Sequence, residues 1–247
     1  MTIGVIGLGE VGSAIIKLCK KKHTVYGRNR SRDELKGKTI DILHICFGYS
    51  SDLPSIVIEA IRELRPKLVI IDSTVKPGTT QGIYQKTKVP IVHAPIVGKH
   101  PNLYRYLVSM PKVIGPINEG AYRAAAKHFN QLGVRTIRFR SPLESEMAKI
   151  LETTYYGWNI IFEKFVHRIC KKLGANHNEV YRQFNEIYNK GYERTLPNVR
   201  RPILDHFPGE IGGHCVVPNA EIIQGWLNDE FTAFLLSQNE KAKKEDA

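Results

Sequence analysis

The sequence predicts an α/β protein: a doubly wound parallel sheet in the N-terminal part, followed by a second, mostly helical domain. Three observations lead to this fold class. Short β-branched runs alternate with helical stretches through the first half. A glycine-rich turn directly follows the first of these runs. After residue 141 apolar residues recur at helical spacing, so we place the two domains at 1–140 and 141–247.

Seven apolar runs are expected to form the strands of the sheet. They are Ile3–Ile6, Thr24–Tyr26, Ile40–Cys46, Leu68–Asp72, Ile91–His93, Lys112–Ile114 and Val134–Phe139. The helical stretches between them predict crossover connections, and therefore parallel pairing.

The helical domain is expected to open with one long helix. Met147, Ile150, Leu151 and Trp158 begin an apolar pattern that predicts a helix to about Leu173. Residues 191–215 are rich in Pro, Gly and charge and are expected to form a long functional loop. The last eleven residues are expected to be a frayed tail.

The first apolar run ends in the pattern G-x-G-x-x-G, formed by Gly7, Gly9 and Gly12. The first glycine permits a tight turn, the second lets a diphosphate approach the backbone, and the third lets helix and strand pack closely. The helix that follows then presents its N-terminus to the phosphates. The pattern therefore predicts an NAD(P)-binding Rossmann domain.

The end of the second strand leaves the choice between NAD and NADP open. The acidic residue that usually holds the ribose of NAD is replaced by Arg28, Asn29 and Arg30. Asn29 can bond a hydroxyl, whereas the two arginines can pair with a 2′-phosphate or remain solvated. The residues assigned to cofactor binding are Gly7, Leu8, Gly9, Glu10, Val11, Gly12, Arg28, Asn29, Arg30, Phe47, Gly48, Ser73 and Thr74.

Composition narrows the possible partners. The formal net charge of +12 attracts polyanions. The basic residues are spread along the chain and lack interleaved aromatic residues, which does not favour nucleic-acid binding. There is neither a secretion signal nor an apolar run of about 20 residues, so we expect a cytoplasmic protein without a membrane span.

The cysteines and histidines do not predict a metal site. Four cysteines, Cys19, Cys46, Cys170 and Cys215, form no CxxC pair and are expected to be free thiols, the first three in the core. His93, His100 and His214 lack helical i, i+4 spacing and are expected at the surface or in turns.

Three further segments resemble the UDP-glucose/GDP-mannose dehydrogenase family. Asp72 to Thr79, DSTVKPGT, is similar to its S-T-V-x-x-G-T turn. Lys149 begins KILETTYYGWNIIF, which resembles the helix that bears a catalytic lysine. Gly212 to Cys215, GGHC, resembles the turn with the nucleophilic cysteine. Together with the glycine turn, these motifs span most of the chain.

The resemblance implies an NAD(P)-dependent dehydrogenase that oxidises a CH–OH group of a small substrate, phosphorylated or nucleotide-linked. It assigns catalysis to Cys215, Lys149 and Thr74, with the cysteine as nucleophile and the lysine as its electrostatic partner. A thiolate adds readily to an aldehyde, and a nearby ammonium stabilises both the thiolate and the developing oxyanion. The residues it assigns to the substrate are Thr153, Asn159, His214 and Asn219.

The chain also departs from the family pattern. The asparagine expected four residues after the lysine is Thr153, and the aspartate four residues after the cysteine is Asn219. Ile96 replaces the glutamate that follows the fifth strand. The sequence ends about thirty residues after Cys215, where family members continue into a further nucleotide-binding domain. We therefore expect slow hydrolysis of a thioester.

Two other functions remain open at this stage. The β-hydroxyacid dehydrogenases share a D-x-S-T turn, an A-P segment and an interdomain lysine, which Asp72, His93 to Pro95 and Lys149 match in part. A non-catalytic NAD(P)-binding scaffold protein would explain the missing carboxylates. We further expect a homodimer through the helical domain, and we expect Tyr155, Tyr156, Trp158 and Phe162 to be packing residues.

Overall fold

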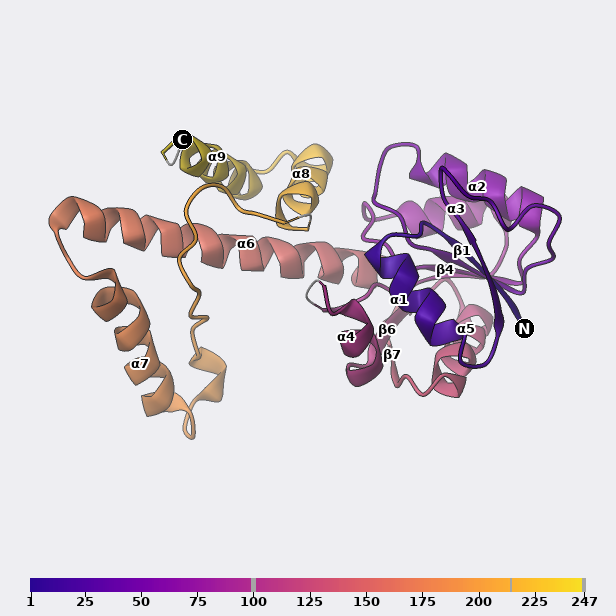
Figure 1. Ribbon diagram of the computed structural model, residues 1–247, viewed down its shortest axis with the longest axis horizontal. Helices are drawn as coiled ribbons and strands as arrows, with labels where there is room; N and C mark the ends of the chain where they lie inside the picture. The colour runs from indigo at the N-terminus through magenta and orange to yellow at the C-terminus, as the bar shows by residue number, and fades with distance from the viewer. Residues whose placement is uncertain (99–100, 214, 246–247) are drawn as a thin grey trace. The chain divides into compact units, whose positions relative to one another are not determined.

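The computed structural model describes residues 1–98, 101–213 and 215–245, which form two compact units (Figure 1). The first unit comprises Met1–Ile150 and the second Leu151–Ala247. The division falls inside the long helix α6, Pro142–Leu173, which begins just after the expected boundary at residue 140. This helix starts five residues before Met147 and ends at the predicted Leu173.

The first unit is built on one seven-stranded sheet in the order β2-β1-β3-β4-β5-β6-β7. All seven predicted strands are present. Their bounds are β1 Thr2–Ile6, β2 Thr24–Arg28, β3 Ile42–Ile45, β4 Leu68–Ile71, β5 Ile91–His93, β6 Lys112–Pro116 and β7 Thr136–Arg138.

The prediction of a wholly parallel sheet is wrong at one position. Strand β6 runs antiparallel to β5, while β6 and β7 are parallel to each other. An apolar run shows where a strand lies but carries no information about its direction, so the alternating pattern could not reveal this reversal.

Helices cover both faces of the sheet, which confirms the doubly wound architecture (Figure 1). One face carries α1 Glu10–Cys19, α4 Leu103–Ser109 and α5 Glu119–Gln131, over a core that includes Ile15, Leu18 and Phe129. The other carries α2 Leu53–Leu64 and α3 Thr79–Thr87, over a core that includes Val57 and Ile83. Each core is closed by aliphatic side chains of the sheet.

The second unit is mostly helical, as predicted. It comprises the rest of α6, a π-helical segment η1 Asn178–Gln183, α7 Phe184–Tyr192, a short 3-10 turn η2 Pro197–Val199, α8 Val216–Leu227 and α9 Glu230–Glu245. Its small core contains Ile161, Ile211, Val216, Ala220 and Leu235. Residues 193–213 are irregular apart from η2 and turns, as expected for a long loop, although 191 and 192 belong to α7.

Two expectations about the second unit are wrong. The expected frayed tail is wrong for Ser237 to Glu245, which belong to α9, while 246 and 247 lie outside the described residues. The polar side chain of Asn239 is buried there and its Oδ1 accepts a hydrogen bond of 2.6 Å from the Ile211 amide. The polar composition of this segment predicted that its side chains are solvated. The hydrogen bond from the Ile211 amide instead satisfies the Asn239 side chain inside the protein, away from water.

The second concerns the aromatic residues of α6. Trp158 does pack, with its ring centroid 4.1 Å from that of Phe231. Tyr155, Tyr156 and Phe162 are instead exposed in the single chain, by 63, 45 and 56%. The helical spacing of these aromatic residues predicted that they lie on a helix. It did not show which side of that helix faces the core.

Candidate functional site

The three glycines of the turn after β1 have different surroundings. Gly7 has a φ of +94°, and a Cβ added to it would lie 2.7 Å from the backbone carbon of Cys46. A Cβ added to Gly12 would lie 1.8 Å from the Gly7 carbonyl oxygen. A Cβ added to Gly9 meets nothing within 4 Å. A side chain at Gly7 or Gly12 would clash with the backbone, so the fold itself requires these two glycines. Gly9 instead lies next to open space at the surface of the turn.

That open space lies at the start of α1. Gly9 is the N-cap residue of this helix and provides no side chain to bond the first backbone N–H groups. These groups carry partial positive charge and suit a phosphate. Chain order places β2 and β3 on opposite sides of β1, so the turn lies at the switch point where α/β proteins bind dinucleotides. Of its other residues, Glu10 is exposed, and Leu8 and Val11 are half-buried.

The segment after β2 distinguishes the two candidate arginines. Arg28 donates to both carboxylate oxygens of Glu63, at 2.7 and 2.6 Å, and to Asp33 at 2.8 Å. These contacts hold the pKa of both carboxyls below their ordinary values. Asn29 uses its Oδ1 to accept from the backbone amides of Ser31 and Arg32, at 3.0 and 2.8 Å.

Arg30 differs from Arg28, only two residues away. It is exposed, and among the described residues its guanidinium makes neither a hydrogen bond nor an ion pair. Arg30 is therefore better placed than Arg28 to pair with a 2′-phosphate.

The next two strand ends are tied together at the same edge of the sheet. Phe47 and Gly48 follow β3, and the Ser73 hydroxyl, which follows β4, donates to the Phe47 carbonyl oxygen at 2.6 Å. A Cβ added to Gly48 meets nothing within 4 Å, and Thr74 is half-buried. Because parallel strands end at one edge, these residues lie along the same side of the sheet as the glycine turn.

The turn that follows β4 is anchored by a carboxylate of α6. Glu146 accepts from the amides of Gly78 and Thr80, at 2.7 and 2.9 Å, and from the Thr80 hydroxyl at 2.6 Å. Burial raises the pKa of Glu146 above its ordinary value, although these three donors favour the ionised form. These hydrogen bonds fix the segment that resembles the family's S-T-V-x-x-G-T turn. They also hold the end of this segment in place where α3 begins.

His93 is not at the surface or in a turn, as expected, but fully buried in β5. Its Nε2 lies 3.0 Å from the Ser73 carbonyl oxygen, and its Nδ1 lies 2.8 Å from the Ser145 hydroxyl. Since a carbonyl only accepts, Nε2 carries the proton and Nδ1 accepts from Ser145. Burial lowers the pKa of His93 to about 3, and the charges of Lys112 and Lys149 act in the same direction. The ring is therefore neutral. His100 and His214 lie outside the described residues.

A buried polar network inside the sheet was missed by the sequence reasoning. Asp72 is 2.6 Å from His44 Nδ1 and 2.8 Å from Lys112 Nζ. His44 Nε2 is 3.2 Å from His128 Nε2, and burial lowers the pKa of His128 to about 2. The available signal was polar residues inside two predicted strand runs, His44 and Lys112. Such residues need partners when buried.

The network also bears on the expectation of no metal. Cys19 Sγ, His44 Nε2 and His128 Nε2 lie within 4.8 Å of one another, a spacing that one ion could bridge. The 3.2 Å contact between the two rings is equally a hydrogen bond from one imidazole to the other, which needs no ion. Cys19, Cys46 and Cys170 are buried free thiols, as predicted.

The residues assigned to catalysis and substrate divide between the two units. Thr74 and Lys149 belong to the first unit, and Lys149 is half-buried. Cys215 belongs to the second, where it is a half-buried free thiol at the N-cap of α8.

The other substrate candidates that are described lie in the second unit. Asn219 Nδ2 donates to Thr153 Oγ1 at 2.9 Å, and both side chains are buried. Asn159 Nδ2 donates to the Tyr155 carbonyl oxygen at 2.7 Å. The structure thus brings together Thr153 and Asn219, two of the three positions at which the chain departs from the family pattern. His214, also assigned to the substrate, lies outside the described residues.

The doubly wound sheet and the open glycine turn at its switch point define a protein of the dinucleotide-binding α/β class. No family model matches the chain. It is 29% identical over 209 residues to UDP-N-acetyl-D-mannosamine dehydrogenase of Methanocaldococcus jannaschii, covering 76% of this chain and 46% of the relative. The chain therefore spans about half the length of the curated relatives it matches.

Solved structures show the same fold. A UDP-D-ManNAc dehydrogenase from Pyrococcus horikoshii matches with a TM-score of 0.81 and 21% identity, over 98% of this chain and 69% of that one. A 3-hydroxyisobutyrate dehydrogenase of Mycobacterium tuberculosis matches with a TM-score of 0.70 and 13% identity, over 100 and 94%. The similarity to UDP-N-acetyl-D-mannosamine dehydrogenases agrees with the resemblance that the chain's motifs indicated. Every helix in its described part is too short or too polar to span a bilayer.

Proposed function

We propose that the chain is an NAD(P)-dependent oxidoreductase that oxidises a CH–OH group of a nucleotide-linked sugar. The observation that carries the proposal is the open space at Gly9, beside an N-terminus of α1 that no side chain of the cap residue covers. The named relatives, which are UDP-N-acetyl-D-mannosamine dehydrogenases, suggest a UDP-linked amino sugar as the first substrate to test.

The residues of the sheet edge fit a dinucleotide. The glycine turn and the start of α1 would hold the diphosphate, and Phe47, Gly48, Ser73 and Thr74 would line the path toward the nicotinamide. Arg30 would pair with a 2′-phosphate and thereby favour NADP. A bound nicotinamide supplies the hydride acceptor.

Cys215 is the proposed nucleophile. A bound nicotinamide would supply the acceptor for a hydride from the alcohol carbon, while the hydroxyl would lose a proton. Cys215 would then add to the resulting aldehyde carbon, and a second molecule of oxidised coenzyme would be needed to accept the hydride that leaves when this adduct becomes a thioester. Cys215 is half-buried at the N-cap of α8. Lys149 is the proposed cation that stabilises the thiolate and the oxyanion.

The last step, hydrolysis of the thioester, is the one this chain is poorly equipped to perform. It needs a base to activate water. Asn219 cannot act as a base, and its amide is committed to Thr153. Ile96 is buried and apolar where the family has a glutamate. We propose that the reaction stops after one hydride transfer or accumulates a covalent adduct on Cys215.

The cofactor proposal is tested with Gly9→Val. Because a Cβ at Gly9 meets nothing within 4 Å, the variant should fold normally while its side chain occupies the space of the diphosphate. Calorimetry should show loss of NAD and NADP binding, with an unchanged circular dichroism spectrum. Unchanged affinity in the folded variant would contradict the assignment.

The chemistry is tested by nicotinamide reduction in the presence of UDP-linked amino sugars, simple alcohols and β-hydroxyacids. Cys215→Ser should abolish adduct formation, and Lys149→Ala should slow alkylation of Cys215 at neutral pH, because a lost cation disfavours the thiolate. Turnover of β-hydroxyacids alone would favour the second enzyme class. Dinucleotide binding without turnover of any substrate would favour a scaffold protein.

We also propose that the chain forms a homodimer through its second unit. Exposed apolar side chains follow one side of α6 at spacings of three, four or seven residues, among them Tyr155, Phe162, Phe165 and Ile169. A second copy offers the same stripe, and a two-fold axis lets each cover the other. Family members associate through the corresponding region, which was also the basis of the sequence expectation.

A further inference from the structure

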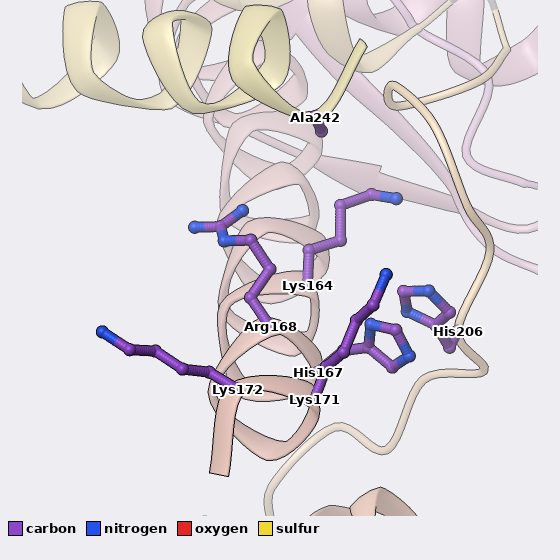
Figure 2. A pocket seen from close by; sticks show the side chains of 7 residues that line it. All are labelled: Lys164, His167, Arg168, Lys171, Lys172, His206 and Ala242. Atoms are coloured by element: carbon purple, nitrogen blue, oxygen red, sulfur yellow. The ribbon is translucent and has the colours of Figure 1, made fainter. Parts of the chain in front are cut away.

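A hollow of about 330 Å³ lies beside the C-terminal half of α6, within the second unit (Figure 2). Six basic side chains line it, and Ala242 of α9 closes one side. They are Lys164, His167, Arg168, Lys171 and Lys172 of α6, and His206 of the long loop. No acidic residue is among the lining residues described. The hollow is thus lined by basic side chains from two separate parts of the chain.

The positions on α6 concentrate charge on one side of the helix. Lys164, Arg168 and Lys172 are spaced i, i+4, i+8, and His167 and Lys171 form a second i, i+4 pair beside them. Like charges at this spacing cost about 0.2–0.5 kcal/mol per pair. The helix dipole favours cations in the last turn, which accounts for Lys171 and Lys172. It does not account for the cations further back along the helix.

Two of the basic groups are held in place by the fold. Lys164 is only 5% exposed, and its ammonium donates to the Phe207 carbonyl oxygen. Arg168 donates from one Nη to Gln238 of α9 at 3.3 Å. A pocket whose cations are already ordered loses less conformational entropy on binding than one formed by mobile side chains.

The two histidines are also ordered. Their rings stack, with centroids 3.6 Å apart and planes 15° apart. His206 Nδ1 lies 3.1 Å from both carboxylate oxygens of Glu163, which is buried and is not among the residues that line the hollow. Burial lowers the pKa of His167, and the charges of His206, His177 and Lys171 act in the same direction, against Glu163.

We propose that this pocket binds a compact phosphate anion that carries several charges, of the inorganic or nucleoside diphosphate class. Four permanent cations exceed what a single carboxylate needs, and a guanidinium beside ammonium groups is the combination that recognises phosphate oxygens. The volume of about 330 Å³ accommodates a single small ligand. An extended nucleic acid would instead need an open groove with stacking aromatic side chains.

The site is separate from the proposed nucleophile. Val216, which follows Cys215, packs against Gly157 of α6. Arg168 lies eleven residues further along the helix, which corresponds to about 16 Å at about 1.5 Å per residue. The pocket therefore takes a second ligand, and the inference does not depend on the chemistry of Cys215.

The test is calorimetric titration of the full chain with inorganic pyrophosphate. All samples carry Gly9→Val, so that the glycine turn adds no phosphate site of its own. We expect saturable binding of one pyrophosphate per chain, weakened at least tenfold in Lys171→Ala/Lys172→Ala. Both lysines are exposed, so the fold should be unaffected. The control Lys190→Ala/Arg194→Ala removes the same charge from exposed positions elsewhere in the second unit and should change affinity less than twofold.

A second readout places the ligand. Pyrophosphate should raise the pKa of His167, measured by proton NMR and assigned with His167→Gln, because a bound anion stabilises the imidazolium. UDP is the second probe: equal affinity shows recognition of the diphosphate alone, and tighter binding shows that the nucleoside contributes. The proposal is overturned by absent saturation, by equal weakening in the control, by an unmoved His167, or by an oligonucleotide that binds more tightly than either probe.

Discussion

The two units differ in how completely each buries its own apolar side chains. Among the described residues, seven large apolar side chains are exposed in the 150 residues of the first unit, and sixteen in the second, which is shorter. The first unit has two cores on either side of a sheet, whereas the second has one small core of five buried residues. The first unit covers most of its apolar side chains by itself, whereas the second leaves a larger set of them exposed in the single chain.

The two units also differ in whether their polar side chains are paired with other groups of the protein. In the first unit, His93 and Asp72 are buried and satisfied by named partners within the sheet or α6. In the second, basic side chains gather around a hollow without an acidic residue in its described lining. The polar groups of the first unit are thus paired inside the fold, whereas the second unit keeps basic side chains around an open hollow.

The largest expected effect concerns the apolar surface of α6. Phe165→Asp should raise the dissociation constant of the homodimer more than 100-fold, because it places a charge in an apolar interface. Phe165 is 46% exposed in the single chain, so the monomer should remain folded. Sedimentation velocity measures the change. Val108→Asp, an exposed apolar position of the first unit, serves as the control and should leave association intact.

If the parent chain sediments as a monomer at micromolar concentration, the prediction is wrong. The exposed apolar surface of the second unit would then not require a second copy to cover it. Dissociation by Val108→Asp but not by Phe165→Asp would move the interface to the first unit.

The second prediction concerns acid and the first unit. His93 and His128 have folded pKa values of about 3 and about 2, against an ordinary value of 6.5. The unfolded chain gains protons as pH falls through 6.5 while the folded chain does not, so stability is full above 6.5 and decreases below it. The two groups together should cost about 2.7 kcal/mol of unfolding free energy between pH 7.5 and 5.5.

Urea unfolding across that range measures the loss. His93→Gln removes one of the two titrating groups, so the dependence on pH should fall by about half. An unchanged slope in this variant would show that His93 is not the source, and that its burial has no consequence for stability.

The third prediction is smaller and concerns the second unit. Thr153→Val should cost about 1–2 kcal/mol of unfolding free energy, because it removes an acceptor from the buried amide of Asn219. Asn219→Ala should cost a similar amount, and the double variant less than the sum of the two. Thermal denaturation of the four proteins measures the coupling. Fully additive effects would show that the 2.9 Å contact contributes nothing.

The sequence predicted the elements well, because strands and helices leave a local pattern. All seven strands and the end of α6 at Leu173 follow from apolar spacing. The direction of β6 and the burial of the last turns of α9 did not follow, since both depend on contacts between residues distant in the sequence. Motif spacing identified the glycine turn. It could not show that, of the three glycines in this turn, only Gly9 lies next to open space.

The side-chain clusters were harder to predict. His44, Asp72, Lys112 and His128 come from four elements, and only the fold brings them together. The cations of α6 were visible as basic residues at helical spacing, but His206, which completes the hollow, lies on the irregular loop. No local pattern connects it to the helix.

The smallest expected effect compares two arginines of the first unit. Arg28 is fixed by Glu63 and Asp33, whereas the exposed Arg30 makes neither a hydrogen bond nor an ion pair among the described residues. Arg30→Ala should therefore weaken NADP binding by about fivefold and leave NAD binding unchanged, because one exposed cation beside a phosphate contributes about 1 kcal/mol. Arg28→Ala should instead lower the melting temperature and leave the coenzyme preference as it is. Calorimetry with both coenzymes and a thermal melt of each variant separate the two roles. If Arg28→Ala alters the preference between NAD and NADP and Arg30→Ala does not, the ligand displaces the ion pairs of Arg28. The contacts of Arg28 inside the first unit would then not keep it from binding the coenzyme.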